Sequence, residues 1–137
     1  MLEIVYGKRG SGKTTQMINR ANEAVKSCKG DIVFVDDDNR CMLNLAHEIR
    51  YINAGEYGCT TPCLLTGFIC GIMAQDYDIE YIFLDGFPEI LGMNDVSEMG
   101  NFVTRIKELA DKFKIKVILS VSGPKGMMPA FMEPYIK

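Results

Sequence analysis

Residues 2–15 read LEIVYGKRGSGKTT, a short apolar run followed at once by a glycine-rich loop. The apolar run at residues 2–6 predicts a strand that ends at Gly7. Beyond the loop, apolar side chains recur at helical spacing, at Met17, Ile18, Ala21, Ala24 and Val25. The stretch therefore predicts a strand, a loop and a helix, in that order.

Three later apolar runs predict further strands, at residues 31–35, 81–84 and 117–121. Strands that alternate with helices pair in parallel through right-handed crossovers. We therefore expect an α/β fold, a three-layer αβα arrangement around a mostly parallel sheet of four to five strands. The length of 137 residues, 47% of them hydrophobic, fits one domain over residues 1–137. Ligands of such sheets bind beyond the carboxyl ends of the strands.

Three segments predict the other helices. Apolar side chains at helical spacing predict a helix over residues 42–52, which Asn53 ends. Residues 64–74 are almost all apolar, with no polar face at helical spacing, and they predict a short strand or turn and then a buried helix. A clear apolar stripe predicts a helix over residues 99–113, with Asp95 as its N-cap.

The loop after the first strand carries the strongest functional signal. Residues 7–14 match the pattern G-x-x-x-x-G-K-[ST] in full, between a predicted strand and a predicted helix. Glycines let backbone amides converge on an anion, and the helix that follows adds its N-terminal partial charge. The ammonium of Lys13 can bind nucleotide phosphates, and the hydroxyl of Thr14 can coordinate Mg²⁺. The candidate nucleotide-binding residues are Gly7, Lys8, Arg9, Gly10, Ser11, Gly12, Lys13, Thr14 and Thr15.

This loop resembles the Walker A element of the P-loop NTPases, and the strand pattern extends the resemblance over most of the chain. The family implies binding of ATP with Mg²⁺ and a catalytic role for Lys13. Residues 81–85, Tyr-Ile-Phe-Leu-Asp, resemble its Walker B element, which implies that Thr14 and Asp85 hold the metal. The alternative is that Asp85 and Gly86 form an ordinary turn that closes the strand.

Residues 34–38, Phe-Val-Asp-Asp-Asp, resemble the RecA-like branch of that family, the core of recombinases and replicative helicases. In this branch an acidic residue after the second strand orients the attacking water. Asp38 stands where the branch usually has Glu, and it reaches about one methylene less far. Asp38 could instead cap the following helix. Glu89 is the alternative base, and Ser120 and Ser122 are either sensors of the γ-phosphate or small residues that close a strand.

The resemblance implies an Mg²⁺-dependent ATPase that hydrolyses the β–γ phosphate bond. Two alternatives stay open. One is a nucleoside kinase of the thymidine kinase type, because residues 85–87, Asp-Gly-Phe, could begin a substrate loop. The other is a nucleotide-binding switch with negligible turnover, which the short side chain of Asp38 favours.

Charge and composition restrict the partners. The 15 basic and 18 acidic residues give a net charge of −3, so nucleic acid would have to be contacted locally, through a few lysines. The RecA-like resemblance implies a homo-oligomer whose subunits complete each other's sites, with Lys125 as the candidate residue. No apolar run approaches the length of a membrane span. Five cysteines and a first segment without a signal pattern predict a reduced, cytoplasmic protein.

The cysteines and the C-terminal segment each leave two interpretations. Cys59 and Cys63, with Cys41 and Cys70 at a distance, have a spacing too loose to favour zinc over buried small hydrophobes. Residues 123–137 hold three prolines and predict an irregular segment or at most one short strand. Its apolar side chains could close the core or dock on a neighbouring subunit.

Overall fold

The computed structural model describes residues 1–39, 42–92, 99–124 and 126–136. Its centre is a five-stranded sheet in the order β1-β5-β4-β2-β3, and every pairing is parallel. The strands are β1 (Leu2–Gly7), β2 (Asp31–Asp36), β3 (Arg50–Asn53), β4 (Ile79–Leu84) and β5 (Lys116–Ser122). The expectation of an α/β fold with a parallel sheet of four to five strands is confirmed.

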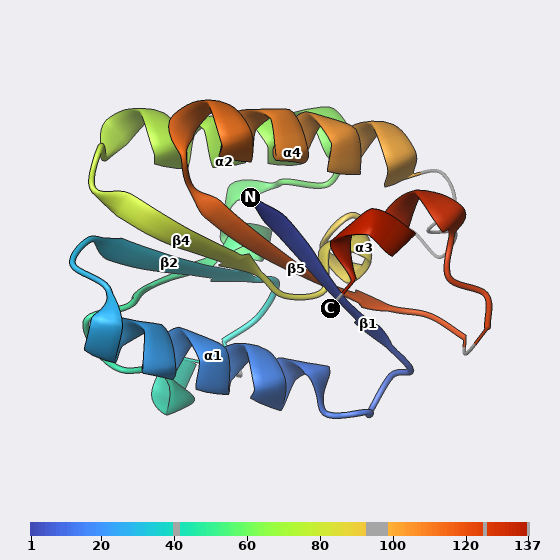
Figure 1. The fold of residues 1–137 in the computed structure, drawn as a ribbon, viewed down its shortest axis with the longest axis horizontal. Helices are drawn as coiled ribbons and strands as arrows, with labels where there is room; N and C mark the ends of the chain where they lie inside the picture. Colours follow the sequence, from blue (N-terminus) through green and yellow to red (C-terminus); the bar gives the residue numbers. More distant parts are fainter. Residues whose placement is uncertain (40–41, 93–98, 125, 137) are drawn as a thin grey trace.

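Helices lie on both sides of this sheet (Figure 1), as a three-layer αβα arrangement requires. One face carries α1 (Lys13–Ser27), and the other carries α2 (Pro62–Gln75) and α4 (Gly100–Phe113). The short helix α3 (Phe87–Ile90) follows β4 at its carboxyl end. β5 lies between β1 and β4 in the sheet, so the segments that follow these three strands meet at one edge.

The central strand β2 shows why the sheet is covered on both faces. Ile32 and Phe34 pack into the apolar cluster that contains α1, whereas Val33 and Val35 pack into the cluster that contains α2 and α4. All four side chains are buried, which explains the continuous apolar run in the sequence. The stripe expected over residues 99–113 forms α4, which buries Phe102, Val103, Ile106, Leu109 and Ala110. Asp95, its expected N-cap, lies outside the described residues.

The expected helix over residues 42–52 is wrong. Met42–Asn44 is a single 3-10 turn, and Arg50–Asn53 is the edge strand β3, paired with β2. Tyr51 stacks on Phe34 on one face of the sheet, while Ile52 packs against the cluster on the other face. The spacing of the apolar residues fits a helix as well as a strand. The open edge of β2 offers backbone hydrogen-bond donors and acceptors, and pairing with them outweighs the local helical pattern.

The segment after β3 contains the expected helix, but it begins earlier than expected. Residues 62–75 form one helix, and between β3 and this helix lies a 3-10 turn (Ala54–Tyr57) and no further strand. The side chain of Thr61 caps α2 by accepting a hydrogen bond from the amide of Leu64 at 3.2 Å, and Pro62 opens the helix. These two signals fix the start of the helix at its first residue, so no chain is left for a strand.

The C-terminal segment closes the core beside β1. Met132 is fully buried within the 3-10 stretch Ala130–Tyr135, and Ile136 forms an isolated parallel bridge with Ile4. Docking of the apolar side chains on a neighbouring subunit is not tested. Lys125, the residue predicted to complete a neighbour's site, lies outside the described residues. Among the described residues, no helix is long and apolar enough to cross a membrane.

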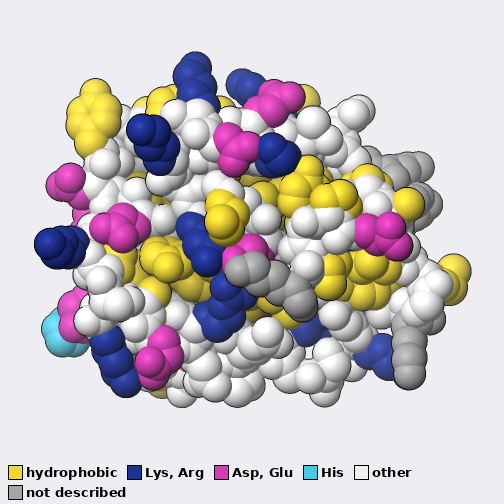
Figure 2. All heavy atoms as spheres, viewed as in Figure 1, with side chains coloured by type: hydrophobic (Ala, Val, Ile, Leu, Met, Phe, Trp, Pro, Cys, Tyr) yellow, Lys and Arg dark blue, Asp and Glu magenta, His cyan; other side chains and the backbone are white. Residues whose placement is uncertain are grey.

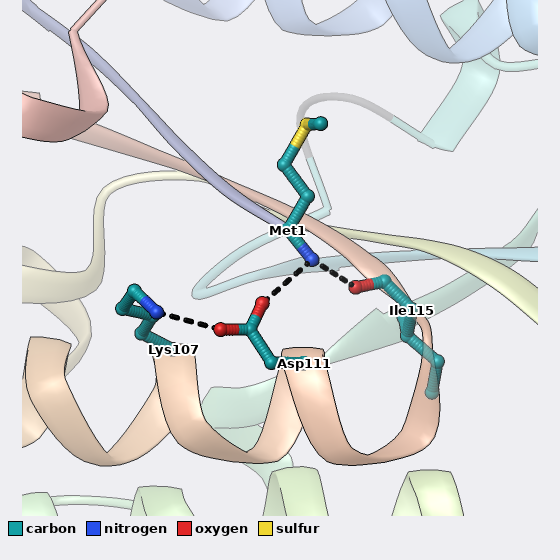
Figure 3. A network of polar contacts seen from close by, with 4 residues as sticks. All are labelled: Met1, Lys107, Asp111 and Ile115. Carbon is teal, nitrogen blue, oxygen red and sulfur yellow. Dashed lines mark hydrogen bonds and ion pairs between the residues drawn. The ribbon is translucent and has the colours of Figure 1, made fainter.

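The start of β1 is tied to two other elements. Figure 3 shows the amino group of Met1 donating to the carbonyl of Ile115 at 3.1 Å and pairing with Asp111 at 3.2 Å. Asp111 also pairs with Lys107 at 2.6 Å, and the Met1 amino group and the Lys107 ammonium together lower the pKa of the Asp111 carboxyl group.

Over the face seen in Figure 2, basic and acidic side chains are interspersed, in keeping with the small net charge.

Candidate functional site

The carboxyl ends of β1, β2, β4 and β5 surround a cleft of about 680 Å³. The segments that form the cleft are far apart in the sequence, and each follows a strand that the sequence analysis predicted. Its described lining comprises Arg9, Gly10, Gly12, Lys13, Thr14, Thr15, Asp36, Asp37, Asp38, Asp85, Gly86, Glu89, Ser120 and Ser122. Of the nine candidate nucleotide-binding residues, Gly7, Lys8 and Ser11 lie outside this lining and face a second groove.

The glycine-rich loop, residues 7–13, turns through two left-handed positions. Gly10 has φ +80° and Gly12 has φ +91°, a region that side-chain-bearing residues rarely adopt. Gly12 is also the N-cap of α1, so the helix begins at the cleft with no capping side chain at that position. The amino end of a 15-residue helix, with its partial positive charge, therefore faces the cleft.

Lys13 is held against the loop that precedes it. Its ammonium donates a hydrogen bond to the carbonyl of Lys8 at 2.7 Å. Partial burial lowers the pKa of Lys13, while the carboxylates of Glu89 and Asp85 oppose that shift. The cation thus lines the cleft, close to carboxylates contributed by the segment after β4.

Asp85 is the centre of a hydrogen-bonded network among three elements. Thr14 Oγ1 donates to Asp85 Oδ2 at 2.9 Å, and Ser120 Oγ donates to Asp85 Oδ1 at 2.5 Å. Ser120 in turn accepts from the amide of Gly86 at 2.8 Å. Asp85 and Ser120 are 5% and 1% exposed, so the bond between them is buried, whereas the bonds from Thr14 and the Gly86 amide are partly buried. The structure brings Thr14 and Asp85 together, and Asp85 and the left-handed Gly86 directly follow β4, as an ordinary strand-closing turn would. A metal-holding role for Thr14 and Asp85 stays a prediction.

The two candidate bases lie in the same cleft. Asp38 follows β2 and is half-buried there; its carboxylate lies within 4.8 Å of those of Asp36 and Asp37. Because residues 42–52 hold a single 3-10 turn and an edge strand in place of the expected helix, the interpretation of Asp38 as the cap of that helix loses its support. Glu89, on α3, has Oε1 3.7 Å from Nη2 of Arg9, and its Oε2 is buried with no hydrogen-bond partner among the described residues.

Ser120 and Ser122 have different surroundings, which the sequence did not distinguish. Both point into the cleft, because alternate residues of a strand face the same side. Ser120 is bonded to Asp85, so it positions that carboxylate, whereas Ser122 closes the strand at the edge of the cleft. The two-residue spacing predicts the shared face, but the bond to Asp85 depends on β5 lying next to β4.

The donor set of the cleft suits a hard divalent cation. The described lining has five carboxylates and only two cationic side chains, Arg9 and Lys13. The hydroxyl of Thr14 and the carboxylate of Asp85 are adjacent oxygen ligands of the kind that Mg²⁺ prefers. Without such a cation, the excess of negative charge would repel a polyphosphate. Among the described residues the cysteines form no metal-binding group, since the only cluster of three candidate ligands is Asp36, Asp37 and Asp38.

The chain matches no known protein-family profile and no curated protein sequence.

Proposed function

We propose that the chain is a P-loop ATPase of RecA-like type, which binds ATP with Mg²⁺ in the cleft and hydrolyses the β–γ phosphate bond. The observation that carries the proposal is the 2.9 Å bond between Thr14 and Asp85. It joins the last residue of the glycine-rich motif to the aspartate that follows β4, although the two residues are 71 positions apart in the sequence. A chance match to either motif gives no reason for the two to meet at the amino end of a helix.

Each side chain of the cleft has a role in this proposal. The amides of residues 10–14 and the ammonium of Lys13 would stabilise charge on the transferred phosphoryl group. Thr14 and Asp85 would hold Mg²⁺, which neutralises phosphate charge when it is bound. Asp38 or Glu89 would accept a hydrogen bond from the attacking water and orient it.

The alternative of a nucleoside kinase gains little from the geometry. Phe87, which follows Asp85 and Gly86, is fully buried and packs against Phe102 at 5.1 Å between ring centroids. Its side chain therefore belongs to the core and is not presented to a second substrate. The alternative of a switch with negligible turnover stays open because Arg9 pairs with Glu89, one of the two candidate bases.

One experiment separates these activities. The protein is incubated with Mg²⁺ and ATP labelled at the γ-phosphate, with and without a panel of nucleosides and with single-stranded DNA. Released phosphate identifies an ATPase, a labelled nucleotide product identifies a kinase, and bound but intact ATP identifies a switch. Absence of any ATP binding, in a protein shown to be folded by circular dichroism, would refute the proposal.

A further inference from the structure

A second groove, of about 540 Å³, lies against the other side of the glycine-rich loop. Gly7, Lys8 and Ser11 contribute the loop side of this groove. Tyr6 and the segment after β5 contribute the rest, through Gly123, Gly126, Met128 and Glu133. The loop therefore has the charged cleft on one side and this groove on the other.

The two hollows differ in chemistry. No aliphatic or aromatic residue is among the described residues that line the cleft, whereas the groove contains an aromatic ring and a thioether. A nucleotide has a polyanionic end and a flat, mostly apolar base. The cleft offers charges and amides to the polyanionic end, but its described lining has no apolar surface on which the base can stack.

The groove is a built feature of the core. Tyr6 and Met128 both pack against the main apolar cluster, so their exposed surfaces have a fixed position. The hydroxyl of Tyr6 donates to the carbonyl of Pro124 at 3.0 Å. Gly123 permits this contact, since a Cβ there would overlap the Tyr6 hydroxyl oxygen. The aromatic ring is thus anchored at one end and open to the groove.

We infer that this groove holds the adenine base of the bound nucleotide, an inference that rests on the proposed function. The base would stack on Tyr6 and Met128, with its exocyclic amino group donating to the carboxylate of Glu133. The ribose would pass over the loop near Gly10, where no atom of the described residues lies within 4 Å of a hypothetical Cβ. Thioether and aromatic surfaces are favourable partners for a purine ring.

The test compares Mg²⁺–ATP with Mg²⁺–tripolyphosphate, which has the phosphates and no base. Met128→Ala is expected to weaken ATP binding about fivefold and to leave tripolyphosphate binding unchanged, because only the base loses its contact. Met127→Ala is the matched control: its side chain is 70% exposed and does not line the groove, so neither ligand should be affected. In the wild-type protein, 8-azido-ATP should label the peptides that contain Tyr6 or Met128.

A second variant tests the hydrogen bond and leaves the core untouched, because Glu133 is exposed. The wild-type protein should bind ATP more tightly than inosine triphosphate, which lacks the amino group, and Glu133→Ala should abolish that preference. An unchanged preference would overturn the role of Glu133. Equal affinities for ATP and tripolyphosphate, or photolabelling elsewhere, would overturn the groove assignment while the proposed function stands. If neither ligand binds, the proposed function fails and this inference falls with it.

Discussion

Ser120→Ala should destabilise the fold and show that Asp85 is held by a network rather than by its strand alone. The hydroxyl of Ser120 takes part in two hydrogen bonds, a buried one donated to the Asp85 carboxylate and a partly buried one accepted from the Gly86 amide. A bond to a charged group contributes about 1.5 to 3 kcal/mol, and a partly buried amide left without a partner adds to the loss. Thr14 still donates to the other oxygen of Asp85, which limits the effect. We expect the free energy of unfolding to fall by about 2 to 3 kcal/mol.

Urea denaturation measures this loss directly, and Ser122→Ala is the matched control. Ser122 lies two residues further along the same strand, on the same face and at the edge of the same cleft. Its replacement should change the free energy of unfolding by about 0.5 kcal/mol or less. If Ser120→Ala also stays within about 0.5 kcal/mol of the wild-type protein, the bond to Asp85 does not hold the site and the reasoning fails.

The other predictions concern the chemistry of the cleft and one surface pair. In single-turnover hydrolysis, Asp38→Asn or Glu89→Gln should slow the step on the order of 100-fold, whichever is the base, with little change in ATP affinity; wild-type rates in both variants would remove both candidates. Chelation of Mg²⁺ should weaken ATP binding on the order of tenfold or more, because five carboxylates line the cleft; equal affinity with and without chelator would contradict the metal assignment. Protonated Asp31 donates a hydrogen bond to the carboxylate of Asp76, which raises the pKa of Asp31, so that pair favours folding in acid and loses this contribution as the pH rises through the raised pKa. Asp76→Asn should therefore raise the melting temperature at pH 7 and not below the ordinary pKa of Asp; the same shift at both pH values would refute the coupling.

Most of the sheet could be predicted because its strands are buried on both faces and so read as continuous apolar runs. The exception, β3, is an edge strand whose apolar residues fall at a spacing that also suits a helix. Only the pairing of Arg50–Asn53 with β2 resolves that ambiguity, and pairing between strands is not a local property of the sequence.

In the candidate site, too, the local features could be predicted from the sequence, and the contacts between distant segments could not. The glycine-rich motif and the aspartate at the end of β4 are local signals, and each was readable by itself. Their contact, and the bond from Ser120 to Asp85, require β5 to lie between β1 and β4, which the sequence does not specify. The groove beside Tyr6 depends on the C-terminal segment packing next to β1, and it left no motif in the sequence.

Binding of the ATP phosphates by the glycine-rich loop is the step on which every other role proposed for the cleft depends. Titration calorimetry with Mg²⁺–ATP on the wild-type protein and on Lys13→Ala tests it most directly. Lys26→Ala is the control, because it removes a lysine from the exposed far end of the same helix. We expect saturable binding in the wild-type protein and in Lys26→Ala, and a loss of affinity on the order of 100-fold in a folded Lys13→Ala. Equal affinity in Lys13→Ala and the wild-type protein, or no binding in either, would contradict it.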